Sequence, residues 1–187
     1  MSPVHARRHF IRRASHAAAM AVASSALPMI ATPARAAMTG ERRLAFFNTH
    51  TRERLALAYA VDGRYVPAAL VALDRLLRDH YSGEVGRIDP QLFDLLHGVQ
   101  RELAQDGTFE VISGFRSDAT NARLRERGGG GVARRSLHLQ GRAIDVRLPG
   151  AALAEVRDAA LSLRGGGVGF YAREQFVHID TGRVRAW

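Results

Sequence analysis

The sequence predicts a single domain of the α+β class, in which helices flank a mostly antiparallel sheet. The first observation is a hairpin signal, because Asp62-Gly63 follows a run of strand-forming residues. The second is a pair of strand-like segments near the carboxyl end, residues 167–171 and 176–180. The third is that segments with apolar residues at helical spacing lie between these strands. Helices and strands in this order favour an α+β domain.

Two strands and a helix are predicted at the start of the domain. Leu44–Phe47 and Leu55–Val61 are the short apolar runs expected of strands, and the Asp62-Gly63 turn follows the second run. Ala68–His80 is predicted to be a helix, because its leucines recur at the spacing of one helical face.

The middle of the domain predicts a helix, a strand and a second helix. Asp89-Pro90 provides an N-cap and a first helical position for a helix that runs through Leu103. Thr108–Ile112 is predicted to be a strand that leads into a loop. Ser117 can then cap a helix over Asp118–Arg127.

The last third of the chain predicts a strand, a helix and a hairpin. Gly141–Arg147 mixes apolar and charged residues, which suits a strand that enters from a loop. Pro149 precedes a predicted helix over about Ala151–Leu163. Gly167–Tyr171 is then expected to pair with Phe176–Asp180 as a carboxy-terminal hairpin.

Two histidines and an aspartate in this part of the chain have the composition of a catalytic zinc site. His138 and Asp145 lie in one short segment, and His178 lies in a later strand whose alternation places Phe176, His178 and Asp180 on one face. Zinc in hydrolytic sites is usually held by three such ligands, with the fourth position left to water. We therefore expect Zn²⁺ at these residues, the alternative being that each histidine is an ordinary hydrogen-bonded residue.

Three motifs resemble those of the LAS-type zinc peptidases, which include D-Ala-D-Ala carboxypeptidases and the hedgehog amino-terminal domain. The motifs are Ser113-Gly114-Phe115-Arg116-Ser117, Ser136-x-His138-x-x-Gly141-x-Ala143-x-Asp145 and Val177-His178-x-Asp180. More closely, the chain from Arg42 to Trp187 resembles the twin-arginine-exported murein endopeptidase family typified by MepK. The resemblance implies a hedgehog or D-Ala-D-Ala peptidase-like site with one Zn²⁺ held by His138, Asp145 and His178.

The resemblance also implies roles for an arginine and a carboxylate. Arg116 would hold a substrate carboxylate or the developing oxyanion, because its planar fork stays charged and offers two donors. Many relatives place an acid three residues before the last histidine ligand, where this chain has Gln175. Asp180 is therefore the predicted general base, with orientation of a ligand histidine as an equal alternative. Glu174 is the other nearby carboxylate.

Three polar residues in the same motifs are predicted to contact substrate, namely Ser113, Ser136 and Gln140. The alternative is that they hydrogen-bond the loop backbone. The glycine run 128–131 lacks the Lys-Ser/Thr of a phosphate loop, so we expect a flexible loop beside the cleft. His50 is predicted to be a turn residue.

Residues 1–36 resemble a twin-arginine signal peptide. Arg7-Arg8 precedes a short apolar stretch over Ala17–Ile30, and Ala34-Arg35-Ala36 fits a cleavage site. An uncleaved anchor is the alternative, although the stretch is short for a span of ~20 residues. Cleavage would leave the domain 37–187 in the periplasm with no stable membrane insertion.

Charge and cysteine content exclude several classes of protein. The chain has a net charge of +9, but five of its 27 arginines lie in residues 1–36, which leaves 22 arginines against 18 acids. This modest excess gives little support for nucleic-acid binding, and no nucleic-acid motif is present. The absence of cysteine excludes disulfides, thiolate zinc ligands and a cysteine nucleophile.

Together these observations predict a zinc-dependent peptidase that acts on the peptide stems of peptidoglycan. The resemblance favours a murein endopeptidase that hydrolyses peptide cross-links. A carboxypeptidase that trims a terminal D-amino acid is one alternative. A non-catalytic wall-binding protein whose zinc supports the fold is the other.

Overall fold

An eight-stranded sheet organises the part of the chain that the computed structural model describes, residues 40–127 and 132–187. Its strands are β1 (Glu41–Asn48), β2 (Arg54–Val61), β3 (Arg64–Tyr65), β4 (Thr108–Ser113), β5 (Ala143–Arg147), β6 (Gly167–Tyr171), β7 (Phe176–Asp180) and β8 (Arg185–Ala186). They lie in the order β3-β2-β1-β4-β5-β7-β6-β8. Neighbours are antiparallel except for the parallel pairs β1–β4 and β6–β8. The predicted α+β class, the mostly antiparallel sheet and both predicted hairpins are confirmed.

Four α-helices and one 3₁₀ helix complete the described residues. They are α1 (Pro67–Leu76), α2 (Pro90–Glu102), α3 (Asp118–Arg127), the 3₁₀ helix η1 (Leu137–Gln140) and α4 (Leu153–Ser162). Helix α2 begins as predicted, because the Asp89 carboxylate accepts a hydrogen bond from the backbone N of Gln91 at 3.0 Å. In the described ranges no helix has the length and apolar character needed to cross a membrane. The predicted leader 1–36 and the glycine run 128–131 lie outside the described residues.

The prediction that the first helix reaches His80 is wrong, since α1 ends at Leu76. The last carbonyl groups of the helix have partners from other segments. The Asn48 side chain donates to the Leu76 carbonyl at 3.0 Å, and the backbone N of Phe115 donates to the Leu77 carbonyl at 2.7 Å. These contacts turn the chain away from the helix axis, and they involve residues distant in sequence.

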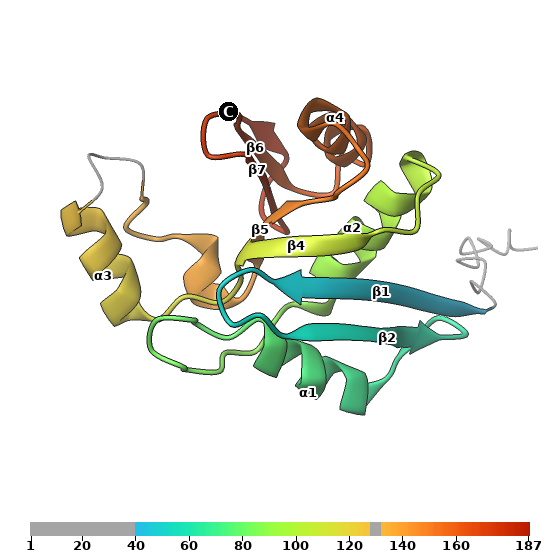
Figure 1. The fold of residues 1–187 in the computed structure, drawn as a ribbon, viewed down its shortest axis with the longest axis horizontal. Coiled ribbons are helices and arrows are strands. Elements are labelled where there is room, and N and C mark those ends of the chain that lie inside the picture. The colour runs from blue at the N-terminus through green and yellow to red at the C-terminus, as the bar shows by residue number, and fades with distance from the viewer. Residues whose placement is uncertain (1–39, 128–131) are drawn as a thin grey trace, which may run out of the picture. The chain divides into compact units, whose positions relative to one another are not determined.

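Helices α1, α2 and α4 pack against the sheet and bury its apolar side chains (Figure 1). Ile144 and Val146 of β5 and Val177 and Ile179 of β7 belong to this core and are at most 2% exposed. Because side chains alternate along a strand, the residues between them point to the opposite face. That face therefore receives polar side chains from the centre of β5 and β7.

The parallel pairing of β1 with β4 brings two loops to the same end of the sheet. Strands that run in the same direction have their carboxyl ends at one edge, so the loops after Asn48 and Ser113 are neighbours. The backbone N of Thr49 donates to the carbonyl of Val111 at 3.0 Å, which fastens the first loop. Figure 1 shows α3 and the connection from α1 to α2 at this same end.

Asp79 joins the loop after α1 to the loop after β4. Its side chain is buried, and Oδ2 accepts hydrogen bonds from the backbone N of Ser117 at 2.9 Å and from Ser117 Oγ at 2.7 Å. Its Oδ1 accepts from the backbone N of Tyr81 at 2.9 Å. Burial by itself raises the pKa of Asp79, but hydrogen bonds from Thr120 and Ser117 outweigh burial and hold that pKa well below its usual range.

Replacing Asp79 by asparagine is expected to lower the free energy of unfolding by about 2 kcal/mol near neutral pH, because charge-assisted hydrogen bonds are lost. A carboxylate with a depressed folded-state pKa stabilises the fold above its unfolded pKa of about 4, and this contribution is lost as the pH falls further. Urea unfolding of parent and D79N at pH 6 and pH 3 measures both effects. An equal difference at the two pH values would contradict the assignment, and D106N, at an exposed aspartate, serves as the control.

Candidate metal centre

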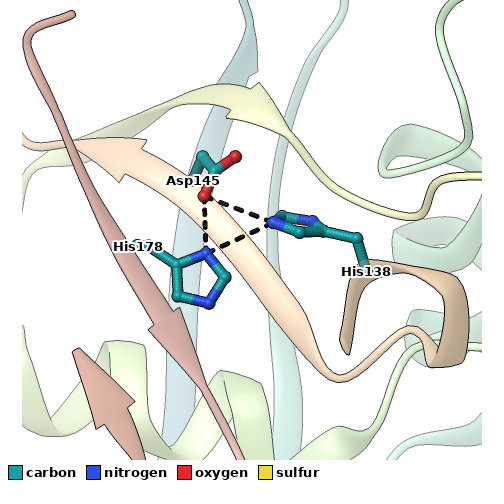
Figure 2. A group of neighbouring side chains, drawn as sticks. All are labelled: His138, Asp145 and His178. Atoms are coloured by element: carbon teal, nitrogen blue, oxygen red, sulfur yellow. Dashed lines mark hydrogen bonds and ion pairs between the residues drawn. The ribbon is translucent and has the colours of Figure 1, made fainter. Parts of the chain in front are cut away.

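His138, Asp145 and His178 meet on the sheet face opposite the core. Figure 2 shows their side chains pointing toward one another from η1, β5 and β7. The Nε2 atom of His138 lies 3.3 Å from Asp145 Oδ1 and 3.3 Å from His178 Nδ1, and the last two atoms are 2.8 Å apart. All three side chains are largely buried. Among the described residues this is the group of acids and histidines that could hold a metal ion.

Strand register places two members of the group side by side. Asp145 on β5 and His178 on β7 are direct cross-strand partners, so their side chains leave the sheet at the same point. η1 brings the third member, His138, and is followed by Gly141, which has a positive φ of 64°. A Cβ atom at position 141 would lie 2.0 Å from the Arg87 carbonyl oxygen, so glycine is needed there.

Hydrogen bonds fix which ring nitrogen each histidine offers. Nδ1 of His138 donates to the Gly114 carbonyl at 2.7 Å, which leaves the lone pair of Nε2 directed at the other two residues. His178 has the reverse arrangement. Its Nε2 donates to Asp180 Oδ2 at 3.1 Å, and its Nδ1 faces Asp145. With a metal ion bound, His138 would offer Nε2 and His178 would offer Nδ1.

Asp180 lies behind His178 and is fully buried. Besides His178, its carboxylate accepts hydrogen bonds from the backbone N of Gly182 at 2.8 Å and of Gly167 at 3.1 Å, and from Arg185 Nη2 at 2.7 Å. Burial raises the pKa of Asp180, but the hydrogen bonds from His178 and Arg185 outweigh it and hold the pKa well below its usual range. The predicted placement of Asp180 on the His178 face of the strand is confirmed.

The electrostatics of the group favour a bound cation. Burial raises the pKa of Asp145, but His138 and His178 outweigh it, so the net pKa lies well below its usual range. Burial lowers the pKa of His178, yet hydrogen bonds to Asp145 and Asp180 raise it to about 9. Two carboxylates thus flank one imidazole in a buried setting, which is an environment that attracts positive charge.

A cleft of about 540 Å³ opens over the three residues. Among the described residues it is lined by Arg116, Val132, Ala133, Arg135, Ser136, Leu137, His138, Asp145, Tyr171, Glu174, Phe176, His178, Arg185 and Trp187. Of the predicted substrate contacts, Ser136 borders the cleft, whereas Gln140 is exposed outside its lining. Ser113 Oγ instead accepts a hydrogen bond from Arg116 Nη2 at 3.2 Å. The same Nη2 lies 3.8 Å from Asp145 Oδ2, so Arg116 points into the cleft beside the cluster.

An aromatic wall on one side of the cleft escaped the sequence analysis. The ring of Trp187 lies 5.3 Å from that of His178, and its Nε1 donates to the Tyr171 hydroxyl at 3.0 Å. Tyr171 in turn stacks on Phe176 with ring centroids 4.5 Å apart. Trp187 packs over Gly169, where any Cβ would lie 2.7 Å from the indole. The sequence held only one signal for this wall, the aromatic residues at both ends of the predicted hairpin.

The two residues before Phe176 differ in their relation to the cleft. Gln175, at the position where many relatives have an acid, adopts a positive φ of 59° and donates from Nε2 to the Ala172 carbonyl. Glu174 borders the cleft. Among the described residues that line the cleft, the carboxylates are those of Glu174 and Asp145, and Asp180 is not one of them.

A buried His–Asp–His cluster at the floor of a cleft, in an α+β domain, is an arrangement that zinc-type metallopeptidases use. A family model described as peptidoglycan L,D-endopeptidase MepK matches residues 36–187, and the chain belongs to this family. The predicted family resemblance is thereby confirmed. Membership of this family makes the protein a peptidase.

Two relatives illustrate the match. The protein of Haemophilus influenzae named "Probable peptidoglycan L,D-endopeptidase MepK" is 42% identical over 165 residues, which cover 88% of this chain and 85% of the relative. Peptidoglycan L,D-endopeptidase MepK of Escherichia coli K12 is 42% identical over 171 residues, covering 90% of this chain and 91% of the relative. The similarity therefore extends over nearly the full length of both proteins.

Proposed function

We propose that the protein is a zinc-dependent peptidoglycan endopeptidase that hydrolyses peptide cross-links of the cell wall. The observation that carries the proposal is the convergence of His138 Nε2, Asp145 Oδ1 and His178 Nδ1 within 3.3 Å of one another at the floor of a cleft. Arg116 lies beside this group, with its Nη2 atom 3.8 Å from Asp145 Oδ2. Relatives that match nearly the whole chain are named as L,D-endopeptidases of peptidoglycan, which supports the substrate class.

The donor set fits zinc. Zinc–nitrogen bonds of about 2.0–2.1 Å in a tetrahedral site place the ligand atoms roughly 3.3 Å apart. The distances from His138 Nε2 to the other two atoms match this separation, and the third distance is 2.8 Å. Two imidazoles and one carboxylate, with no thiolate in the chain, are a set that zinc hydrolases use.

Zinc held by these three residues would supply a water molecule acidic enough to attack an amide near neutral pH. The chain's own residues then act on the substrate and on the ligands. Arg116, held by Ser113 Oγ, places a fixed positive charge beside Asp145, where it can stabilise the oxyanion formed from the substrate carbonyl. Ser136 can hydrogen-bond the peptide at the cleft edge, and Trp187 can pack against it.

Export is part of the same proposal. A wall-degrading peptidase must reach peptidoglycan, and Arg7-Arg8 followed by an apolar stretch supports twin-arginine export to the periplasm with cleavage after Ala36. Cell fractionation, with mass determination of the amino terminus of the recovered protein, tests this expectation.

The function is tested by incubating the purified protein with cross-linked muropeptide dimers and analysing the products by chromatography and mass spectrometry. We expect dimers to be converted to monomers, with activity lost in chelator and restored by Zn²⁺. The fragment masses identify the bond. Loss of only a terminal residue would make the protein a carboxypeptidase, and binding of wall fragments without cleavage would make it a wall-binding protein.

Asp180 is proposed to orient His178, in preference to acting as the base, because its carboxylate contacts the ring nitrogen opposite to the one that faces Asp145. Replacing Asp180 by asparagine is expected to weaken metal binding about 10- to 100-fold. Activity should recover when the metal concentration is raised. Titration with Zn²⁺, followed by both bound metal and cleavage rate, measures this.

If Asp180 were the base, D180N would keep its metal and lose activity at every metal concentration. The exposed Asp158 provides a matched control, and D158N should bind metal like the parent.

Glu174, whose carboxylate borders the cleft, is the candidate base that contrasts with Asp180. If it accepts the proton from the attacking water, E174Q will lower kcat while metal affinity stays unchanged.

A further inference from the structure

A group of basic and aromatic side chains adjoins Arg116 but lies outside the lining of the metal cleft. It comprises His50, His80, Tyr81 and Arg123, and we call it the basic cluster. The rings of His50 and His80 stack in parallel with centroids 3.8 Å apart, and the rings of His80 and Tyr81 are 4.2 Å apart. The guanidinium of Arg123 lies 4.6 Å from the centre of the Tyr81 ring. Four side chains from three separate segments thus form one continuous surface.

The fold assembles the basic cluster beside Arg116 for identifiable reasons. His50 follows β1, and Arg116 follows the parallel strand β4, so both lie at one end of the sheet. Asp79 binds the His80 loop to Ser117, the residue after Arg116. Helix α3, which carries Arg123, is joined to the cleft rim because Asn121 Nδ2 donates to the Ala133 carbonyl at 3.2 Å. The basic cluster and the cleft therefore share a border.

Two polar atoms of the basic cluster are buried without a hydrogen-bond partner among the residues that the structure describes. These atoms are His80 Nε2 and Arg123 Nε. A buried polar atom without a partner costs about 1–3 kcal/mol, so native proteins rarely keep two in one place unless a ligand or water satisfies them. Arg123 Nε is a donor only, so an acceptor group is what it lacks.

The fixed charges around the basic cluster are two guanidinium groups and one carboxylate. Burial and the neighbouring His50 ring lower the pKa of His80 to about 4; Asp79 opposes this shift, and Arg116 and Arg123 add smaller contributions to it. The His80 imidazole is therefore neutral near pH 7 and offers a hydrogen bond without a charge of its own. The carboxylate of Asp79 is occupied by Ser117 and the backbone N of Tyr81. Near His80, Arg116 and Arg123 supply two positive charges and the buried Asp79 supplies one negative charge.

A second metal site does not explain this arrangement. The His50 and His80 rings are parallel within 1° and stacked, so their nitrogen lone pairs lie in parallel planes and do not converge on one ion. Two arginines nearby also oppose a cation. The described residues place no carboxylate together with these two histidines in a metal-binding group.

We propose that the basic cluster is a second substrate subsite, which binds a free carboxylate of the peptidoglycan stem peptide while the scissile amide lies over the metal centre. The inference rests on the proposed function. Stem peptides carry free carboxylates close to their cross-links, and arginine and imidazole N–H groups are the donors that bind them. Tyr81 and the stacked imidazoles supply an apolar floor for the adjacent methylene groups.

Two single variants test the subsite. R123Q removes the charge, and H80F keeps an aromatic ring against His50 but removes the ring nitrogens. Each is expected to raise KM for cross-linked muropeptides about tenfold, with kcat and metal content close to the parent values. With muropeptides whose free carboxylates have been amidated, the parent should show the same raised KM, and the variants should add little to it.

Arg125, exposed on the same helix, provides the matched control, and R125Q should keep the parent KM. Unchanged KM values in R123Q and H80F, with an active parent, would overturn the proposed subsite but not the proposed endopeptidase function. Calorimetry with an uncross-linked stem peptide distinguishes failure of the subsite from failure of the proposed endopeptidase function. A parent that neither cleaves dimers nor binds this peptide would overturn both the function and the subsite.

Discussion

Replacing His138 by alanine is expected to remove the metal ion and to lower kcat/KM for muropeptide dimers by more than about a thousandfold. The His138 Nε2 atom is one of three converging ligand atoms, and two remaining ligands do not hold zinc at ordinary concentrations. The fold should persist, because the residue sits on the short helix η1 outside the apolar core. Metal content by elemental mass spectrometry and cleavage rates by chromatography measure the two effects.

The control for this variant is H97A, at a histidine on α2 away from the cleft, which should keep its metal and its activity. Full metal content in H138A would remove His138 from the proposed ligand set. Lost activity combined with full metal content would instead assign His138 a role in substrate binding.

Replacing Arg116 by glutamine is expected to lower kcat about 10²- to 10³-fold, the range measured when one oxyanion donor is removed from an enzyme. Metal content should stay at the parent value, because Arg116 contacts the outer oxygen of Asp145 at 3.8 Å, whereas the ligand atom is Oδ1. R116K should recover only part of the rate, since an ammonium group cannot reproduce the two-donor fork. Steady-state kinetics on muropeptide dimers, with metal content measured in parallel, test this.

A change confined to KM in R116Q would contradict the oxyanion role and would assign Arg116 to carboxylate binding, the other role that the family resemblance implies. R173Q, at an exposed arginine in the turn between β6 and β7, provides the control. It removes the same charge from the carboxyl-terminal hairpin and should leave both kinetic constants near the parent values.

The elements that could be predicted from the sequence are those with strong local signals. Asp89-Pro90 set the start of α2, and alternation identified the β6–β7 hairpin. The two-residue strands β3 and β8 are too short to show a period, and each forms only because a neighbouring strand offers its edge. The end of α1 depends on Asn48 and Phe115, which contact its last carbonyls from distant parts of the chain.

The candidate site divides in the same way. His138, Asp145 and His178 could be predicted as one group because each lies in a recognisable short motif and because strand alternation fixes the face on which His178 lies. The position of Asp180 on the face of His178 also followed from alternation. Its burial did not, because the groups that occupy its carboxylate, Arg185 and the backbone N of Gly167, come from β8 and β6. Trp187 is likewise placed by the β8 pairing.

The direct pairing of Asp145 with His178 also has a consequence for folding. Side chains alternate with a period of two, so a slip of β7 against β5 by one residue would turn His178 to the helix-covered face and separate the two ligands. An ion that binds both residues would therefore stabilise only chains with the native register. In cells the metal supply would then favour chains whose strands β5 and β7 pair in the native register. The backbone amides at the centre of the sheet would also exchange their hydrogens more slowly in the metal-loaded protein.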